Sequence, residues 1–182
     1  MLQTLNDAPT SPPVSASIAD LPGFAWLAAA GASLGEDGLP DFGDRPAEAA
    51  AALSSDVIAP LADRGLIRVR GADRDAFLQG QLSNDLRQLS PERSLLASYS
   101  TPKGRVLAIF TALRTGDEIW LETSRSLLAP TLKRLKMFVM RSKLTLDDAS
   151  AELIAIGLAG PTRGTGASFL TRASAASRRP EA

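Results

Sequence analysis

Hydrophobic and polar positions follow a two-residue period through the middle of this chain. In residues 95–100, Leu95, Ala97 and Tyr99 alternate with Leu96, Ser98 and Ser100. Such alternation is typical of a strand with one buried face. Residues 106–113 are apolar on both faces, as expected of a strand that is covered on each side. Residues 118–122 follow a Thr-Gly-Asp turn, and residues 101–104 carry Pro and Gly where a type I turn favours them. The pattern predicts three consecutive antiparallel strands.

Two helices are predicted on either side of these strands. Asp73 can cap the first helix, which has one apolar face. The second helix spans 126–141, with Ser124 or Ser126 as its cap, and Pro130 fits it only in the first turn. Short apolar runs predict four further strands, at residues 57–59, 66–69, 143–146 and 153–158. The order β-β-α-β-β-β-α-β-β indicates an α+β fold, in which helices pack on one side of an antiparallel sheet.

The composition changes towards both ends of the chain. Residues 1–50 are interrupted by proline and glycine, which predicts a disordered or loosely docked leader. A short docked helix around Trp26 is the alternative for part of it. Residues 55–161 hold the predicted elements and form the expected domain. Residues 162–182 are mostly small or polar, which predicts a disordered tail.

Charge and residue types narrow the possible chemistry. The formal net charge is zero, which gives no support for direct nucleic-acid binding. Residues 1–44 hold six acidic residues and no Lys or Arg, so residues 45–182 carry a net charge of +6 that could attract anionic small molecules. The chain has no Cys and no His. A zinc site of the ordinary type and Cys or His nucleophilic catalysis are therefore excluded within it.

Neither a membrane span nor a targeting segment is predicted. No stretch approaches the roughly 20 apolar residues that a membrane-spanning helix needs. Signal and transit peptides need early positive charge, whereas the first basic residue here is Arg45. We expect a cytoplasmic protein without a membrane partner.

Three blocks of sequence carry a resemblance to a known superfamily. The first is G-A-D-R-D-A-F-L-Q-G-Q-L-S-N-D at residues 71–85, the second is T-P-K-G-R-V at residues 101–106, and the third is L-K-R-L-K-M-F-V-M-R-S-K-L at residues 132–144. In this order and spacing they resemble the YgfZ and glycine-cleavage T-protein superfamily. The resemblance covers residues 55–161 and implies the amino-terminal part of an incomplete folate-binding fold.

The resemblance also implies a function. Members of the YgfZ branch hold tetrahydrofolate or a derivative in a channel that three domains enclose. They assist the assembly or repair of iron–sulfur clusters and thereby affect tRNA modification, which implies iron–sulfur proteins as partners besides the folate. Because the later part of the fold is not represented, we expect a truncated form.

Two departures from the superfamily limit what the resemblance implies. The K-G-C-Y-x-G-Q-E signature of the later part is absent, in agreement with the lack of Cys. T-proteins carry an acidic pair after the hairpin glycine, and the corresponding positions here are Ala108 and Ile109, whose side chains can neither accept a proton nor hold a folate nitrogen. We therefore predict a folate-binding helper without catalytic or metal-binding residues. An aminomethyltransferase-like enzyme fragment, a ligand-free interaction module and a truncated product without a function of its own remain alternatives.

Six residues are candidates for ligand contact: Arg64, Asn84, Asp85, Tyr99, Lys103 and Arg105. Arg64 stands where some members of the superfamily carry a Trp that touches folate, and it can stack on a pterin or serve as a turn residue. Asn84 and Asp85 can line the channel or cap a helix. Lys103 and Arg105 can contact an anion or remain solvated, and the single tyrosine is either a core residue or a ligand platform.

A positive surface is expected around the end of the second helix. It consists of five basic residues: Lys133, Arg134, Lys136, Arg141 and Lys143. This surface would suit a polyglutamylated folate. Alternatively, the cations only complement the helix dipole, at about 0.3–1 kcal/mol each.

Overall fold

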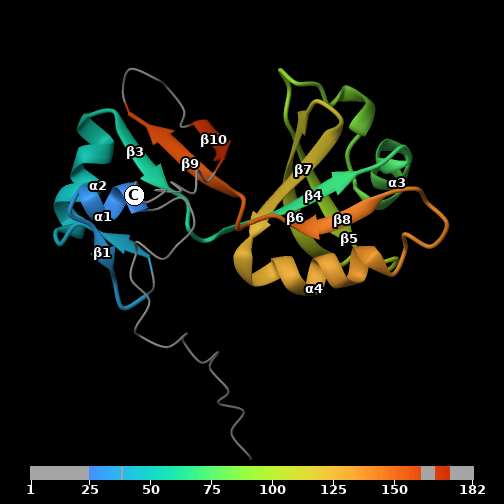
Figure 1. The fold of residues 1–182 in the computed structure, drawn as a ribbon, viewed down its shortest axis with the longest axis horizontal. Coiled ribbons are helices and arrows are strands. Elements are labelled where there is room, and N and C mark those ends of the chain that lie inside the picture. Colours follow the sequence, from blue (N-terminus) through green and yellow to red (C-terminus); the bar gives the residue numbers. More distant parts are fainter. Residues whose placement is uncertain (1–24, 38, 161–166, 173–182) are drawn as a thin grey trace, which may run out of the picture. The chain divides into compact units, whose positions relative to one another are not determined.

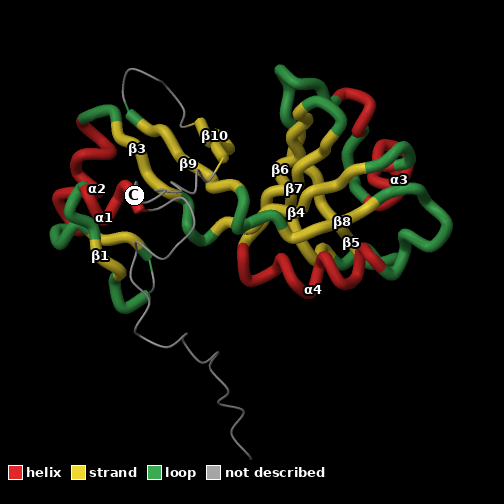
Figure 2. The backbone as a smooth tube through the Cα atoms, in the orientation of Figure 1, coloured by secondary structure: helices red, strands yellow, loops and turns green. Residues whose placement is uncertain are grey.

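The computed structural model describes residues 25–37, 39–160 and 167–172, and these form two compact units (Figures 1 and 2). The first unit contains the chain up to Ala62 and from Ile156 onward, and the second unit spans Asp63–Ala155. The three blocks that carry the family resemblance all lie in the second unit.

The first unit is built on a three-stranded sheet. Its strand order is β10-β9-β3, with β3 at Val57–Pro60, β9 at Leu153–Ala159 and β10 at Ala167–Arg172. β3 and β9 are antiparallel, with Val57 opposite Ala159. Both strands were predicted from their apolar runs, but as parts of one domain over 55–161. The local pattern identifies each strand and does not encode its pairing with a strand far away in the sequence.

Regular structure in the first unit begins well before residue 50. The elements are helix α1 (Ala25–Ala29), strands β1 (Ser33–Leu34) and β2 (Pro40–Asp41), which pair as an antiparallel hairpin, and helix α2 (Arg45–Ser54). These elements lie within residues 25–50 of the expected disordered or loosely docked leader, and α1 agrees with the alternative of a short helix around Trp26. The rest of the expected leader lies outside the described residues.

One arginine links the hairpin to helix α2. The Arg45 side chain contacts Asp37 at 2.8 Å and Asp41 at 2.6 Å, so it joins the start of α2 to the hairpin. Its hydrogen bonds lower the pKa of Asp37 to about 2. Asp44 caps α2 by accepting a hydrogen bond from the Ala47 N–H.

At the other end of the chain, β10 falls within the expected tail, and the remainder of that tail lies outside the described residues.

The second unit contains a five-stranded antiparallel sheet with the order β5-β6-β7-β4-β8. Its strands are β4 (Arg64–Arg70), β5 (Leu95–Ser100), β6 (Val106–Thr115), β7 (Glu118–Ser124) and β8 (Thr145–Asp148). The predicted three-strand meander is confirmed as β5-β6-β7. Its first turn closes through the Gly104 N–H, which donates to the Thr101 carbonyl at 2.9 Å.

The hydrophobic core lies on one side of this sheet, which we call the inner face. Alternate residues of the strands contribute to the core, among them Ile67, Val69, Ala97, Phe110 and Leu121. Three helical elements cover it: α3 (Arg74–Gln81), the 3-10 helix η2 (Leu86–Gln88) and α4 (Arg125–Lys136). Figure 1 shows α4 running along one side of the sheet. The predicted α+β fold with helices on one side is confirmed.

The details of the helices differ from the prediction. Asp73 and Ser124 stand at the N-cap positions of α3 and α4, but neither side chain makes a capping hydrogen bond. Pro130 lies inside α4, beyond its first turn, and the helix ends at Lys136 instead of residue 141. A turn follows, in which Met140 has a positive φ of 40° that ends the helical path. None of the described helices has both the length and the apolar content of a transmembrane segment.

Candidate functional site

The side of the five-stranded sheet opposite the core, which we call the outer face, is partly uncovered. Cross-strand pairing places Leu66 opposite Glu122, Glu122 opposite Thr111, and Thr111 opposite Leu96. These residues form a row across β4, β7, β6 and β5. Leu66 and Glu122 are buried, whereas Leu96 is exposed. The outer face is thus covered at β4 and β7 and open at β5 and β6.

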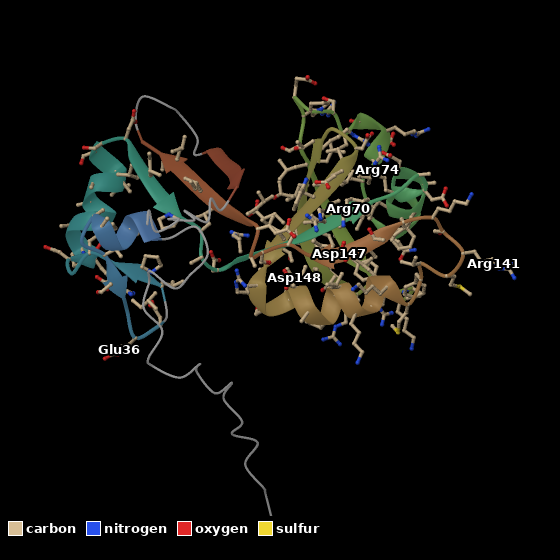
Figure 3. The ribbon with its side chains drawn as sticks, in the orientation of Figure 1. Glu36, Arg70, Arg74, Arg141, Asp147 and Asp148 are labelled. Atoms are coloured by element: carbon tan, nitrogen blue, oxygen red, sulfur yellow. The ribbon has the colours of Figure 1, made fainter. Side chains whose placement is uncertain are left out.

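Part of the outer face is a closed network of side chains. Arg68 lies over the Trp120 ring, with 5.6 Å between guanidinium carbon and ring centroid, and it also pairs with Glu152. Arg70 pairs with Asp147 at 3.2 Å. Both residues are labelled in Figure 3. Because Arg68 and Arg70 already have partners within the sheet, we assign this network a structural role.

The chemically distinctive pair on this face is Arg64 and Glu122. Glu122 is only 5% exposed, and its Oε1 lies 3.7 Å from the Arg64 Nε. That distance is longer than a hydrogen bond. Burial raises the pKa of the Glu122 carboxyl, the Arg64 guanidinium opposes this rise, and Asp63 adds to it. Glu122 therefore keeps a proton to higher pH than an exposed glutamate and can act as acceptor or donor towards a ligand.

Apolar surface adjoins this pair. Ile109 is 56% exposed, and its parity along β6 places it on the outer face with Thr111. The neighbouring Ala108 is buried in the core. Of the two positions that correspond to the acidic pair of T-proteins, only Ile109 reaches the outer face. The arrangement offers apolar area, one buried carboxyl and one guanidinium, a combination that small-ligand sites use to hold and orient a ring.

The raised pKa of Glu122 predicts a pH-dependent change in stability. A carboxyl whose pKa rises on folding favours the folded state in its protonated form, so this contribution is lost as the pH rises from the ordinary value of 4.5 through the raised pKa. Glu122→Gln cannot ionise. We expect it to raise the free energy of unfolding at pH 7 by about 1 kcal/mol, the scale for a poorly satisfied buried polar group. The gain should shrink towards pH 4 in urea titrations.

Glu118→Gln is the matched control, since Glu118 lies on the same strand and is more exposed. Its effect should stay within about 0.5 kcal/mol at both pH values. An equal gain for Glu122→Gln at pH 4 and pH 7 would contradict this account.

Comparison with known proteins finds relatives for about half of the chain. No family model matches it. The chain is 36% identical over 103 residues to the tRNA-modifying protein YgfZ of Escherichia coli O157:H7, and 35% identical over 101 residues to YgfZ of Shigella boydii. Over this stretch the chain is homologous to YgfZ. Each match covers 55% of this chain and 30% of the relative, so the chain spans about a third of the length of the YgfZ proteins that it matches.

A solved structure supports the fold. The glycine cleavage system aminomethyltransferase T of Bartonella henselae superimposes with a TM-score of 0.63 at 18% identity. The match covers 78% of this chain and 40% of that protein. The YgfZ homology and this likeness agree with the fold that the three sequence blocks implied, represented here in part.

The structure places the predicted ligand residues at separate positions. Arg64 lies on the outer face, beside Glu122. Asn84 lies next to β5, where its Nδ2 donates to the Leu96 carbonyl at 3.0 Å. Asp85 caps η2 by accepting from the Arg87 N–H, and its ion pair with the Arg87 side chain lowers the pKa of Asp85. Capping thus accounts for Asp85.

The other three candidates do not join Arg64. Tyr99 is buried in the core opposite Ala108, so it belongs to the inner face, in agreement with the alternative of a core residue. Lys103 and Arg105 are exposed at the β5–β6 turn, and among the described residues neither has a carboxylate partner within ion-pair distance. They remain available for an anion. The described residues contain no cluster of acidic side chains that could hold a metal ion.

Glu122 is the residue that the sequence analysis missed. The signal was a charged residue directly after the apolar run Ile119-Trp120-Leu121 and before Thr123. Period-two alternation alone leaves such a residue on either face. Its burial depends on β4, which places Leu66 directly opposite.

Proposed function

We propose that this chain contributes a folate-binding wall of the YgfZ type, in a protein that assists iron–sulfur cluster assembly or repair and thereby tRNA modification. The observation that carries the proposal is the buried Glu122 beside Arg64 on the outer face, next to its open part at β5 and β6, in a chain with sequence similarity to YgfZ. YgfZ is named a tRNA-modifying protein. We extend that role to this chain as a proposal, together with a cytoplasmic location and iron–sulfur proteins as partners.

The donor set fits a reduced folate. A pterin ring presents N–H groups on one edge and a flat face, so it needs an acceptor at the edge and apolar or cationic area against the face. Glu122 would accept from the N–H edge. Arg64 would stack on the ring or bind the glutamate end, and Ile109 and Leu96 would pack against the apolar body. Lys103 and Arg105 are the candidates for a second anionic contact.

We assign no catalytic residue. Aminomethyl transfer requires a group that can take up or donate a proton near the folate nitrogen. Ile109 reaches the outer face without such a group, and Glu122 lies on the neighbouring strand. The proposed role of Glu122 is to bind and orient the ligand.

A titration followed by NMR tests the proposal directly. With 5-formyltetrahydrofolate as the probe and ¹⁵N-labelled chain, the amide signals of residues 64, 109, 111 and 122 should shift together. One open face and a few surface ion contacts, at about 0–1 kcal/mol each, support only weak binding. We expect a dissociation constant on the order of 1 mM, which corresponds to about 4 kcal/mol.

Single-residue variants test whether the folate contacts the outer face. Glu122→Ala should weaken the shifts several-fold, whereas Glu118→Gln should leave them unchanged. Lys103→Ala reports whether the hairpin cations take part. Shifts confined to other residues, or absent at 10 mM folate, would rule out the outer face as a folate wall.

A further inference from the structure

A groove runs along α4, on a part of the second unit that the folate proposal does not use. Its apolar walls come from Leu107 of β6 and from Leu127, Pro130 and Met137, and its basic side chains are Lys133 and Arg134. The volume of the groove is about 400 Å³. We call it the α4 groove. It contains none of the residues of the Arg64–Glu122 pair.

The cations of the α4 groove lack carboxylate partners. Residues 125–146 contain no Asp or Glu. Among the described residues, no carboxylate lies within ion-pair distance of Lys133 or Arg134, whereas Arg68 and Arg70 are both paired. The Arg134 Nε is also buried, with no hydrogen-bond acceptor in the described structure. Because Lys133 and Arg134 have no acidic partner among the described residues, carboxylates of a bound partner could pair with their charged ends.

Exposed apolar side chains extend the groove beyond the end of α4. Met137, Phe138 and Met140 are all exposed, and Met140 reaches 88%. Arg141 projects from the same segment, as Figure 3 shows. A helix dipole explains basic residues near the end of α4, but it does not explain large apolar side chains in water beside them. Methionine is common on surfaces that adapt to a protein partner.

We propose that the α4 groove binds an acidic amphipathic helix of a partner protein. The apolar stripe of that helix would lie along Leu127, Met137 and Leu107, and its carboxylates would pair with Lys133 and Arg134. α4 has twelve residues and is about 18 Å long, which suits a partner helix of about three turns with anchors at i, i+4 and i+7.

The features of the groove favour a helix over a nucleic acid. Phosphate binding needs cations and, for single strands, exposed aromatic rings on which bases stack. The aromatic ring here is Phe138, and the Arg134 guanidinium already lies 6.0 Å from its centroid. The remaining exposed surface is methionine and leucine, which complements an apolar stripe.

Fluorescence anisotropy with the full chain tests the proposal. The probe is a labelled 18-residue peptide with Leu at i, i+4 and i+7 positions and Glu at most others. A second peptide has the same composition in an order that destroys the apolar stripe, and a transfer RNA serves as a polyanion without such a stripe. We expect the amphipathic peptide to bind at least ten-fold more tightly than either competitor at 150 mM salt. Equal binding of the reordered peptide, or tighter binding of the RNA, would overturn the proposal.

Charge reversal tests the position of the site. The Lys133→Glu and Lys136→Glu double variant changes only exposed side chains and should weaken peptide binding at least ten-fold. Met137→Ser should weaken it about five-fold. The matched control is Arg93→Glu, because Arg93 is also exposed and lies outside α4, and it should change the affinity less than two-fold. Equal losses in the control and the double variant would place the binding elsewhere and refute the α4 groove.

Discussion

Replacing Phe110 with alanine is expected to lower the free energy of unfolding of the second unit by about 3–5 kcal/mol. Phe110 is completely buried on the inner face. Its neighbours on that face are small, with Ala97 directly opposite on β5 and Ala108 and Ala112 on either side along β6. These alanines cannot fill the space of the ring, so the variant would keep much of the cavity. Urea unfolding of both proteins, followed by fluorescence, measures the difference.

Ile109→Ala is the matched control for this prediction. It removes apolar atoms from the next residue of the same strand, whose side chain is largely exposed on the outer face. We expect a loss below about 1 kcal/mol, which reflects strand propensity more than packing. Similar losses for the two variants would mean that the inner and outer faces of β6 are assigned incorrectly.

The contrast between these two residues also indicates what sequence reasoning could recover. The meander from β5 to β7 was predictable because its alternation and its turns are local. The pairing of β3 with β9 was not, since it joins Val57 to Ala159. Within residues 25–54, Arg45 pairs with two aspartates, and this is a tertiary contact that composition does not reveal.

The candidate site was recovered less completely than the fold. Arg64 was found through the resemblance, but its partner Glu122 becomes distinctive only when neighbouring strands bury it. Two residues of the first sequence block, Gln79 and Ser83, make structural hydrogen bonds. Gln79 accepts from the Leu86 N–H at 2.8 Å, and Ser83 accepts from the Ser98 N–H at 2.9 Å. These contacts belong to the scaffold, whereas the proposed folate wall lies on the outer face of the sheet.

The first and third sequence blocks meet at one tight contact. Asp73 accepts a hydrogen bond from the Lys143 N–H at 2.6 Å, and Gly71 lies against the same segment with a φ of +117°. A Cβ on Gly71 would stand 2.3 Å from the Lys143 carbonyl oxygen and 2.6 Å from the Leu144 Cα. Both neighbours are backbone atoms and cannot rotate away. This contact joins the start of α3 to the chain that leads into β8.

Gly71→Ala is accordingly expected to destabilise the second unit by about 3 kcal/mol or more. Backbone strain at this φ costs on the order of 1–3 kcal/mol for a residue with a Cβ, and the steric overlap adds to it. Gly116→Ala separates the two effects, because Gly116 also has a positive φ, +55°, but no atom lies within 4 Å of a Cβ placed there. The control should lose only about 1–2 kcal/mol, the cost of the left-handed conformation. If thermal and urea unfolding gave equal losses for both variants, the close contact with Lys143 and Leu144 would not contribute, and the two sequence blocks would not be held together at this point.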